Sequence, residues 1–348
     1  MSEAATKERE PRIGGPLVAA GVDGRPRPRR AGELVRTFFS YQAAGPLVAL
    51  VLAIAVFSVT TDTFLNGQNL SLILQQTVVV GTLAIGQTLI ILTSGIDLSI
   101  AAIMVIGTVV MGRIALDGNW ALALLVGGVV CVALGAVNGL IISRLNLPPF
   151  IVTLGALTAL TAAAQLFTSS ASYPVSAKGL TILGQGIPVG GTTVLSWGVL
   201  VWIVVIAVTS YALSRTAWGA HLYAIGNSET AAKLNGVKVS RVLFGVYVLG
   251  GVICAIGAWQ ALGRTPVADP SAYATANLDS ITAVVVGGTS LFGGRGGVLG
   301  TILGSLIVTV LANGLVLAGI SSLYQQVATG ILVVAAVLVD QVMRKRRA

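Results

Sequence analysis

The polar segment at residues 211–241 is the longest polar interruption in the apolar middle of this sequence. Four lysines or arginines against one glutamate predict that the segment lies on the cytoplasmic side of a membrane. Its charged or titratable side chains belong to Arg215, His221, Glu229, Lys233, Lys238 and Arg241.

Within this segment, residues 229–236 (Glu-Thr-Ala-Ala-Lys-Leu-Asn-Gly) are predicted to form a short helix. Ser228 precedes it as a capping residue, Glu229 and Lys233 are spaced for an i,i+4 ion pair, and Gly236 is suited to end it. We expect the helix to lie on the cytoplasmic face and to dock on a motor supplied by another chain. An ordinary solvated loop is the open alternative.

The sequence contains no constellation of residues that would carry out catalysis by itself. His221 is the only histidine, and neither His-Glu-x-x-His nor a Cys/His metal spacing occurs. Cys131 and Cys254 lie inside apolar runs, so a disulfide framework or a metal site is not indicated. The nucleotide-binding pattern G-x-x-x-x-G-K-[ST] is absent as well. We therefore expect a protein that is not an enzyme and needs no cofactor, and any ATP that drives it must be hydrolysed by another polypeptide.

Charged residues are scarce inside the apolar runs, whereas intramembrane charge is the usual mark of an ion- or proton-coupled pathway. Asp97 is predicted to cap the helix that follows it. Asp340 is predicted to pair with Arg344 at i+4. The other polar groups are neutral, which suits a polyhydroxylated solute and suits helix–helix hydrogen bonds equally well. Five of them are candidates for a substrate path: Gln87, Asn138, Thr153, Gln165 and Asn313.

The composition indicates that these residues belong to a membrane protein. The chain has 348 residues, of which 55% are hydrophobic and 9% charged, and its mean hydropathy is +0.91. Soluble domains carry about 25% charged residues, so an integral membrane protein is predicted. The net charge of +9 lies largely at the two ends, including Arg-Lys-Arg-Arg at 344–347, which indicates membrane anchoring rather than binding to nucleic acid.

The apolar runs predict an all-α, polytopic membrane protein with about ten transmembrane helices and with both termini in the cytoplasm. A disordered basic cytoplasmic tail is expected at 1–37, a transmembrane domain at 38–343 and a basic cytoplasmic tail at 344–348. The eighth span is short and ends in a glycine-rich turn, which fits a broken or re-entrant element. The predicted spans are 42–60, 72–93, 99–115, 120–142, 150–168, 196–213, 242–262, 280–293, 298–318 and 323–343.

Two stretches of the chain are similar to each other. GQTLIILTSG (86–95) and GGTSLFGGRG (287–296) each end a span at a glycine-rich turn. Such a similarity is the pattern that a parallel repeat of span pairs would leave in a transporter sequence.

Several longer motifs resemble one known family. They are TSGIDLS (93–99), ITAVVVGGTSLFGGRGGVLGTILGSLIV (281–308), ANGLVLAGISSLYQQVATG (312–330), AAVLVD (335–340) and AIGNSETAAKLNGVKV (224–239). Over about residues 40–343 the chain resembles the permease subunits of bacterial ABC importers for monosaccharides, of the ribose/xylose/galactose type.

This resemblance implies a homodimer in the cytoplasmic (inner) membrane, in contact with lipid. ABC ATPase subunits would dock beneath it, and a periplasmic or lipid-anchored sugar-binding protein would dock on loops 169–195 and 263–279. The segment departs from the broader importer pattern Glu-Ala-Ala-x-x-x-Gly, because Thr230 follows Glu229 and one extra residue precedes Gly236. By analogy, the residues that would meet the ATPase are Gly226, Asn227, Glu229, Ala231, Ala232, Lys233 and Gly236.

Two alternatives differ in kind from an importer subunit. An ion-coupled secondary carrier for a small neutral polar solute is disfavoured by the scarcity of buried carboxylates. A membrane-embedded enzyme is disfavoured because acid, base and metal candidates are lacking.

Overall fold

The computed structural model of the protein describes the backbone of residues 44–345 and most side chains in that range. The predicted tail at 1–37 and residues 346–348 lie outside the described residues. The side chains of Asp340 and Arg344 lie outside them as well, so the predicted ion pair between them stays a prediction.

Helices make up most of the described chain, and each of the ten predicted spans overlaps one of them, although the eighth span (280–293) runs past the end of its helix at Val286 into the glycine-rich turn. The helices are α2 (Ala44–Thr60), α3 (Gly67–Leu92), α4 (Ile100–Ala115), α5 (Trp120–Leu145), α6 (Pro149–Thr168), α7 (Lys178–Thr181), η1 (Ile182–Gly184), α8 (Trp197–Arg215), α9 (Ala217–Asn227), α10 (Glu229–Leu234), α11 (Val239–Arg264), α12 (Ala276–Val286), α13 (Val298–Leu317) and α14 (Ser322–Lys345).

Local sequence signals explain where several helices begin and end. The side chain of Asn66 accepts a hydrogen bond from Gln68 N at the start of α3, and Asn119 accepts one from Leu122 N at the start of α5. Both are the N-cap interaction for which asparagine is preferred. Pro149 occupies the first turn of α6, where its missing N–H costs nothing.

Six of the described helices are long and apolar enough to cross a membrane: α3, α5, α6, α8, α11 and α13. The apolar helices α2, α4 and α12 and the segment Leu323–Ala335 of α14 are shorter. The count of six rests on length and composition alone, so the number of ten crossings and the side on which each terminus lies stay predictions.

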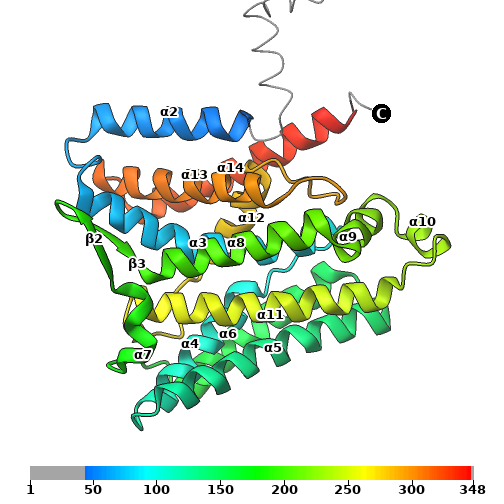
Figure 1. Ribbon diagram of the computed structural model, residues 1–348, viewed down its shortest axis with the longest axis horizontal. Helices are drawn as coiled ribbons and strands as arrows, with labels where there is room; N and C mark the ends of the chain where they lie inside the picture. The colour runs from blue at the N-terminus through cyan, green and yellow to red at the C-terminus, as the bar shows by residue number, and fades with distance from the viewer. Residues whose placement is uncertain (1–43, 346–348) are drawn as a thin grey trace, which may run out of the picture. The chain divides into compact units, whose positions relative to one another are not determined.

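Helix α3 forms the centre of the bundle. It packs against α4, α8, α11, α12 and α13, and 83% of its apolar stretch is buried, compared with 11% for α6. Figure 1 shows α3 among these helices. The exposed apolar faces of α5, α6 and α8 are what a membrane protein presents to lipid, whereas the polar residues of α3 must find partners inside the protein.

Two of the buried helices, α4 and α12, are short. With 11 residues, α12 is about 17 Å long, roughly half the 30 Å hydrocarbon thickness of a bilayer. It ends at the glycine-rich turn 287–297, which leads into α13. The eighth predicted span therefore corresponds to a helix that is too short to cross a bilayer alone.

Two small antiparallel sheets were not predicted from the sequence. Strands β2 (Gly186–Gly190) and β3 (Thr193–Ser196) form a hairpin. Strand β1 (Tyr173–Pro174) pairs with β4 (Val267–Ala268). The second pairing joins the loops 169–195 and 263–279, which are almost 100 residues apart in the chain. The hairpin lies at one end of the bundle in Figure 1, and α9 and α10 lie at the opposite end.

Candidate functional site

The short helix predicted at 229–236 is present as α10, and its predicted stabilising contacts are confirmed. The Ser228 hydroxyl accepts a hydrogen bond from Ala231 N (3.2 Å), and Lys233 Nζ lies 2.5 Å from Glu229 Oε1. Gly236 has φ +82°, the left-handed conformation that glycine adopts easily at the end of a helix. Both charged side chains are about half exposed, so the ion pair stabilises the helix only slightly.

The residues of α10 divide into an outer and an inner face. Glu229, Ala231 and Lys233 are exposed, as is Gly236 after the helix, whereas Ala232 is buried in a hydrophobic cluster of the bundle. Ala232 therefore attaches the helix to its own chain. Sequence reasoning missed Leu234, which is 85% exposed. An exposed leucine at the tip of a charged helix offers an apolar contact to a partner.

Helix α9, which precedes α10, contacts two turns that lie far from it in the sequence. Ser94 Oγ donates to the carbonyls of Gly226 (3.2 Å) and Phe292 (2.9 Å), and Gly294 N donates to Leu92 O (3.0 Å). A Cβ at position 226 would overlap Leu92 O and Gly294 N. Only glycine lets the three backbone segments approach so closely. We call this meeting point the α9 junction.

Asn227 and Tyr223 complete the α9 junction. Asn227 is exposed and lies directly against Gly294, and its side-chain amide donates to Tyr223 O (2.9 Å). The Tyr223 hydroxyl donates to Gly296 O (2.9 Å). Burial raises the pKa of the Tyr223 phenol above its ordinary value, so the group stays protonated and can donate. The turns of the two similar stretches, 86–95 and 287–296, thus both contact α9.

A second polar cluster surrounds the turn between α3 and α4, residues 93–99. Asp97 Oδ1 accepts hydrogen bonds from Ser99 N (2.7 Å) and from Ser99 Oγ (2.6 Å). Ser99 is the N-cap residue of α4 and makes no side-chain capping hydrogen bond, so Asp97 stabilises the turn before the helix and does not occupy the predicted capping position. The Ser99 hydroxyl accepts a further hydrogen bond from Asn138 Nδ2 (2.9 Å). This cluster, which we call the 93–99 turn, links α5 to the beginning of α4.

Three other helices bind the backbone of the same turn. The Gln87 side-chain amide donates to Asp97 O (3.0 Å) and accepts from Asp97 N (3.2 Å). The Thr153 hydroxyl donates to Ile96 O (3.0 Å). Asn277 Nδ2 donates to Leu98 O (3.2 Å). Side chains from α3, α5, α6 and α12 therefore converge on seven residues of irregular backbone and supply the partners that an apolar interior does not.

The five candidates for a substrate path do not gather around one cavity. Gln87, Asn138 and Thr153 are buried, and each makes a hydrogen bond to the 93–99 turn. Asn313 is half-buried and exchanges two side-chain hydrogen bonds with Asn69 (3.0 and 2.8 Å). Gln165 is exposed on α6. Four of the five therefore have partners within the chain, which favours the helix–helix alternative for them.

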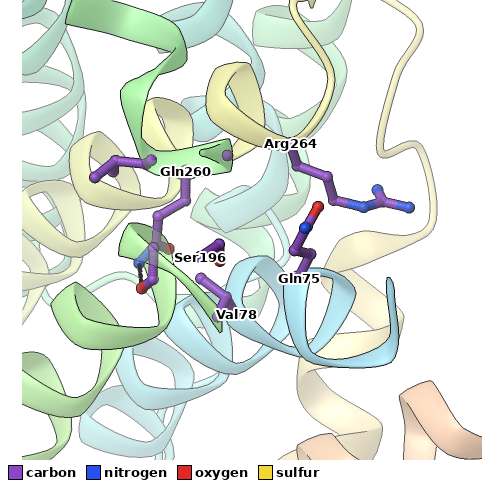
Figure 2. Close-up of a pocket in the computed structure, with 8 residues that line it drawn as sticks. Gln75, Val78, Ser196, Gln260 and Arg264 are labelled. Atoms are coloured by element: carbon purple, nitrogen blue, oxygen red, sulfur yellow. Dashed lines mark hydrogen bonds between the residues drawn. The ribbon is translucent and has the colours of Figure 1, made fainter. Parts of the chain in front are cut away.

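A small pocket lies toward the end of the bundle opposite to α9 and α10, between α3, the start of α8 and the end of α11. Figure 2 shows Gln75 and Arg264 on one side of it and Gln260 on the opposite side, with Ser196 and Val78 between them. The Gln260 amide is buried, and we call this the Gln260 pocket. Across residues 44–345, no three His, Cys, Asp or Glu side chains with described positions gather where they could hold a metal ion.

Comparisons with known proteins agree on one family. Residues 69–337 match the family described as branched-chain amino acid transport system / permease component. The chain is 41% identical over 321 residues to the fructose import permease protein FrcC of Rhizobium meliloti, covering 90% of this chain and 89% of that protein. It is 36% identical over 309 residues to the ribose import permease protein RbsC of Bacillus subtilis, covering 86% and 93%. No solved structure matches the chain.

Proposed function

Because the chain belongs to the family of branched-chain amino acid transport system / permease components, we propose that it is the permease subunit of an ATP-driven ABC importer. The solute is a monosaccharide, a pentose or a hexose, and it is carried across the cytoplasmic membrane. The chain hydrolyses nothing itself, and a separate ATPase supplies the energy.

One observation carries this proposal. Relatives that are 36% to 41% identical over nearly the whole chain are named as import permeases for fructose and for ribose. The similarity covers the transmembrane helices and the polar segment alike, so it is not limited to one motif. The six long apolar helices are consistent with a multi-pass membrane protein.

We place α9 and α10 on the cytoplasmic side and the Gln260 pocket toward the outside. Four basic side chains against one acidic one in the polar segment support this orientation. In Figure 1 the C-terminal end of α14 points toward the end of the bundle where α9 and α10 lie, as expected for a cytoplasmic C-terminus. Ten membrane segments, with α12 as a partial one, complete the proposed topology.

The exposed face of α10 is the proposed contact with the ATPase. Glu229, Ala231 and Lys233 line this face, and Leu234 adds an apolar anchor of the kind that dominates binding energy at interfaces. Gly226 and Asn227 lie one turn earlier, at the α9 junction. In this proposal they connect the docking helix to the bundle.

The α9 junction is the proposed route by which a movement of the ATPase reaches the bundle. A displaced α10 carries α9 with it, and α9 contacts the turn after α3 and the turn before α13 at Gly226. Packed interfaces of this kind switch between discrete arrangements instead of deforming gradually. Two such arrangements, one open to each side, would move a solute without any chemistry in this chain.

The joined loops at the opposite end are the proposed docking surface for a sugar-binding protein. The β1–β4 pairing holds loops 169–195 and 263–279 together, so a partner can contact both at once. A second copy of the chain is proposed as the neighbour in the membrane. The low burial of α6 within one chain leaves a surface that lipid or this second copy can cover.

The direct test is to co-express the chain with its ATPase and sugar-binding protein, purify the complex and reconstitute it in liposomes. We expect the ATPase to co-purify and [¹⁴C]ribose or [¹⁴C]fructose uptake to require ATP. Leu234→Ala should reduce the co-purified ATPase severalfold, because an interface anchor is removed. Its matched control, Leu249→Ala, alters an exposed leucine in the middle of α11 and should leave the complex intact.

Uptake that survives depletion of ATP and stops when an ion gradient is dissipated would overturn the proposal in favour of a secondary carrier. Sugar uptake by the purified chain without any ATPase would also contradict it.

A further inference from the structure

Two arginines lie at the same end of the helix pair α5 and α11. Arg144 is in the last turn of α5, and Arg241 is in the first turn of α11. Ser240 Oγ donates to Ser143 O (2.7 Å), so the residues next to the two arginines are in direct contact. Figure 1 shows α5 and α11 side by side, with α10 beyond this end of α11.

These arginines are exposed, and neither has an acidic partner among the described side chains. In that part of the chain, the one ion pair joins Lys233 to Glu229. Lys238, which directly precedes α11, is exposed and unpaired in the same sense. We call Arg144, Lys238 and Arg241 the basic patch. Three positive charges without a counter-charge attract an anion.

Apolar side chains continue from the basic patch along both helices. At about 100° per residue, Val137, Leu140 and Arg144 fall on one face of α5. Val137 and Leu140 are 51% and 49% exposed. On α11, Val252 lies on the same face as Arg241 and is 37% exposed. Each arginine therefore stands at the end of an exposed apolar face.

The two faces lie on the same side of the helix pair. Ile142 of α5 and Val246 of α11 belong to one buried hydrophobic cluster, so the inward sides of the two helices coincide. The exposed sides, which carry Arg144 and Arg241, therefore coincide as well. The result is one continuous outer surface that is basic at its end and apolar below.

The dimensions of this surface suit a phospholipid. About three helical turns separate Arg241 from Val252, a rise of about 17 Å. The hydrocarbon of one leaflet is about 15 Å thick, half of the bilayer core. Gly245 lies one turn after Arg241, and nothing stands within 4 Å of the place where a Cβ would be. An acyl chain can lie against the backbone there.

We propose that the basic patch binds the headgroup of one anionic phospholipid, whose acyl chains lie on the apolar surface of α5 and α11. The planar guanidinium groups of Arg144 and Arg241 suit a phosphate, which they can bind in a bidentate way. A zwitterionic lipid fits less well, because the three basic side chains repel its ammonium group. The site requires that the chain lies in a membrane, and it goes beyond the proposed function because neither solute nor ATPase takes part.

Quenching of a local fluorophore by spin-labelled lipids measures the headgroup preference of this surface. The two native cysteines, Cys131 and Cys254, are buried, so a bimane on Val137→Cys reports on the face below Arg144. The full-length variant is placed in nanodiscs of phosphatidylcholine. Phosphatidylglycerol or phosphatidylcholine with a nitroxide on one acyl chain is then added, and the ratio of the two quenching efficiencies gives the preference.

Helix α8 provides a matched reporter. Val208 is 63% exposed and lies seven residues before the exposed Arg215 at the end of α8, the same spacing as from Val137 to Arg144. A bimane on Val208→Cys therefore reports on a face with a single arginine at its end. We expect the preference for phosphatidylglycerol to be about fivefold greater at Val137 than at Val208, the effect of one additional basic contact.

Substitution of the basic patch tests its role directly. In the Val137→Cys background, Arg144→Gln combined with Arg241→Gln should lower the preference for phosphatidylglycerol at least fivefold. Arg215→Gln removes a positive charge from a different helix at the same end of the bundle and should leave that preference unchanged. High salt should weaken the preference of the parent protein, because it screens exposed charges.

Equal preferences at the two reporters would overturn the site, because they would reflect a general attraction to basic helix ends. A preference at Val137 that persists after both arginines are replaced would overturn it too. Since neither ATP nor sugar enters these measurements, the lipid site can fail while ATP-dependent uptake is normal, and it can hold in a chain that binds no ATPase.

Discussion

The 93–99 turn and the Gln260 pocket are two polar regions inside the same apolar bundle, and they differ in how their hydrogen-bonding groups are used. At the turn, Gln87, Asn138, Thr153 and Asn277 each have a partner. In the pocket, the Gln260 oxygen has none among the described residues. The turn is not wholly satisfied, because the Tyr247 hydroxyl beside Gly95 also lacks a partner there.

The difference separates polar groups that stabilise the fold from one that does not. A side chain whose donors and acceptors are already paired has to break those bonds before it can bind a solute, and each break costs free energy. A buried group with an unpaired acceptor lacks the hydrogen bond that would offset its desolvation, so it contributes less to stability. Polar residues in an apolar span therefore cannot be assigned to a transport path by residue type alone.

The largest expected effect on stability and transport comes from a substitution at the α9 junction, which contacts the 93–99 turn through Ser94. In an open helix, Gly→Ala is stabilising by up to about 1 kcal/mol. At Gly226 the added Cβ would overlap Leu92 O and Gly294 N, so Gly226→Ala should be destabilising by about 2 to 3 kcal/mol and should lower uptake per ATP about tenfold. Thermal unfolding and reconstituted uptake measure the two effects.

The matched control is Gly245→Ala in α11, where nothing lies within 4 Å of the added Cβ. It should be neutral or slightly stabilising. Equal behaviour of the two variants would show that the close backbone contact at Gly226 has no mechanical importance.

The next largest effect tests whether the hydrogen bonds at the 93–99 turn stabilise the fold. Gln87→Met keeps the side-chain volume but leaves the buried N–H and C=O of Asp97 without the partner that holds them. We expect the free energy of unfolding to fall by about 2 kcal/mol, the cost of orphaning buried polar groups. Unfolding in mixed detergent micelles gives the measurement, and a change below about 0.5 kcal/mol would contradict the assigned role.

A substitution at Gln260, whose side-chain oxygen has no hydrogen-bond partner among the described residues, should change stability much less. Gln260→Met removes one long hydrogen bond and one unpaired acceptor, so the two contributions nearly cancel. The free energy of unfolding should stay within about 0.5 kcal/mol of the unsubstituted protein. If Gln260→Met is as destabilising as Gln87→Met, the distinction between the two regions fails.

The smallest expected effect on stability concerns the exposed ion pair of α10. Lys233→Ala removes an ion pair between two half-exposed side chains, which should lower stability by less than about 0.5 kcal/mol. The loss should shrink further at high salt, because screening weakens exposed charge pairs. A large, salt-independent loss in thermal unfolding would mean that Lys233 has a structural role inside the chain.

The approximate positions of the long apolar helices and the form of α10 could be predicted from the sequence, whereas α7, η1 and α9 were not predicted. Runs of apolar residues are long because a bilayer is thick, and this signal needs no knowledge of neighbours. The cap at Ser228, the Glu229–Lys233 spacing and the turn at Gly236 are local as well, and each is present. The exposure of Leu234 was missed because the side that a short helix buries depends on what lies beneath it.

Only the tertiary structure determined how the polar residues are paired. Gln87 lies ten residues from Asp97, Asn138 lies 39 residues from Ser99, and Asn277 lies 179 residues from Leu98. The β1–β4 pairing joins two loops that show no common pattern in sequence. The sequence by itself determined that neutral polar groups lie in apolar helices. Whether each is paired depends on which helix faces it, because in an apolar interior every hydrogen bond must come from another part of the protein.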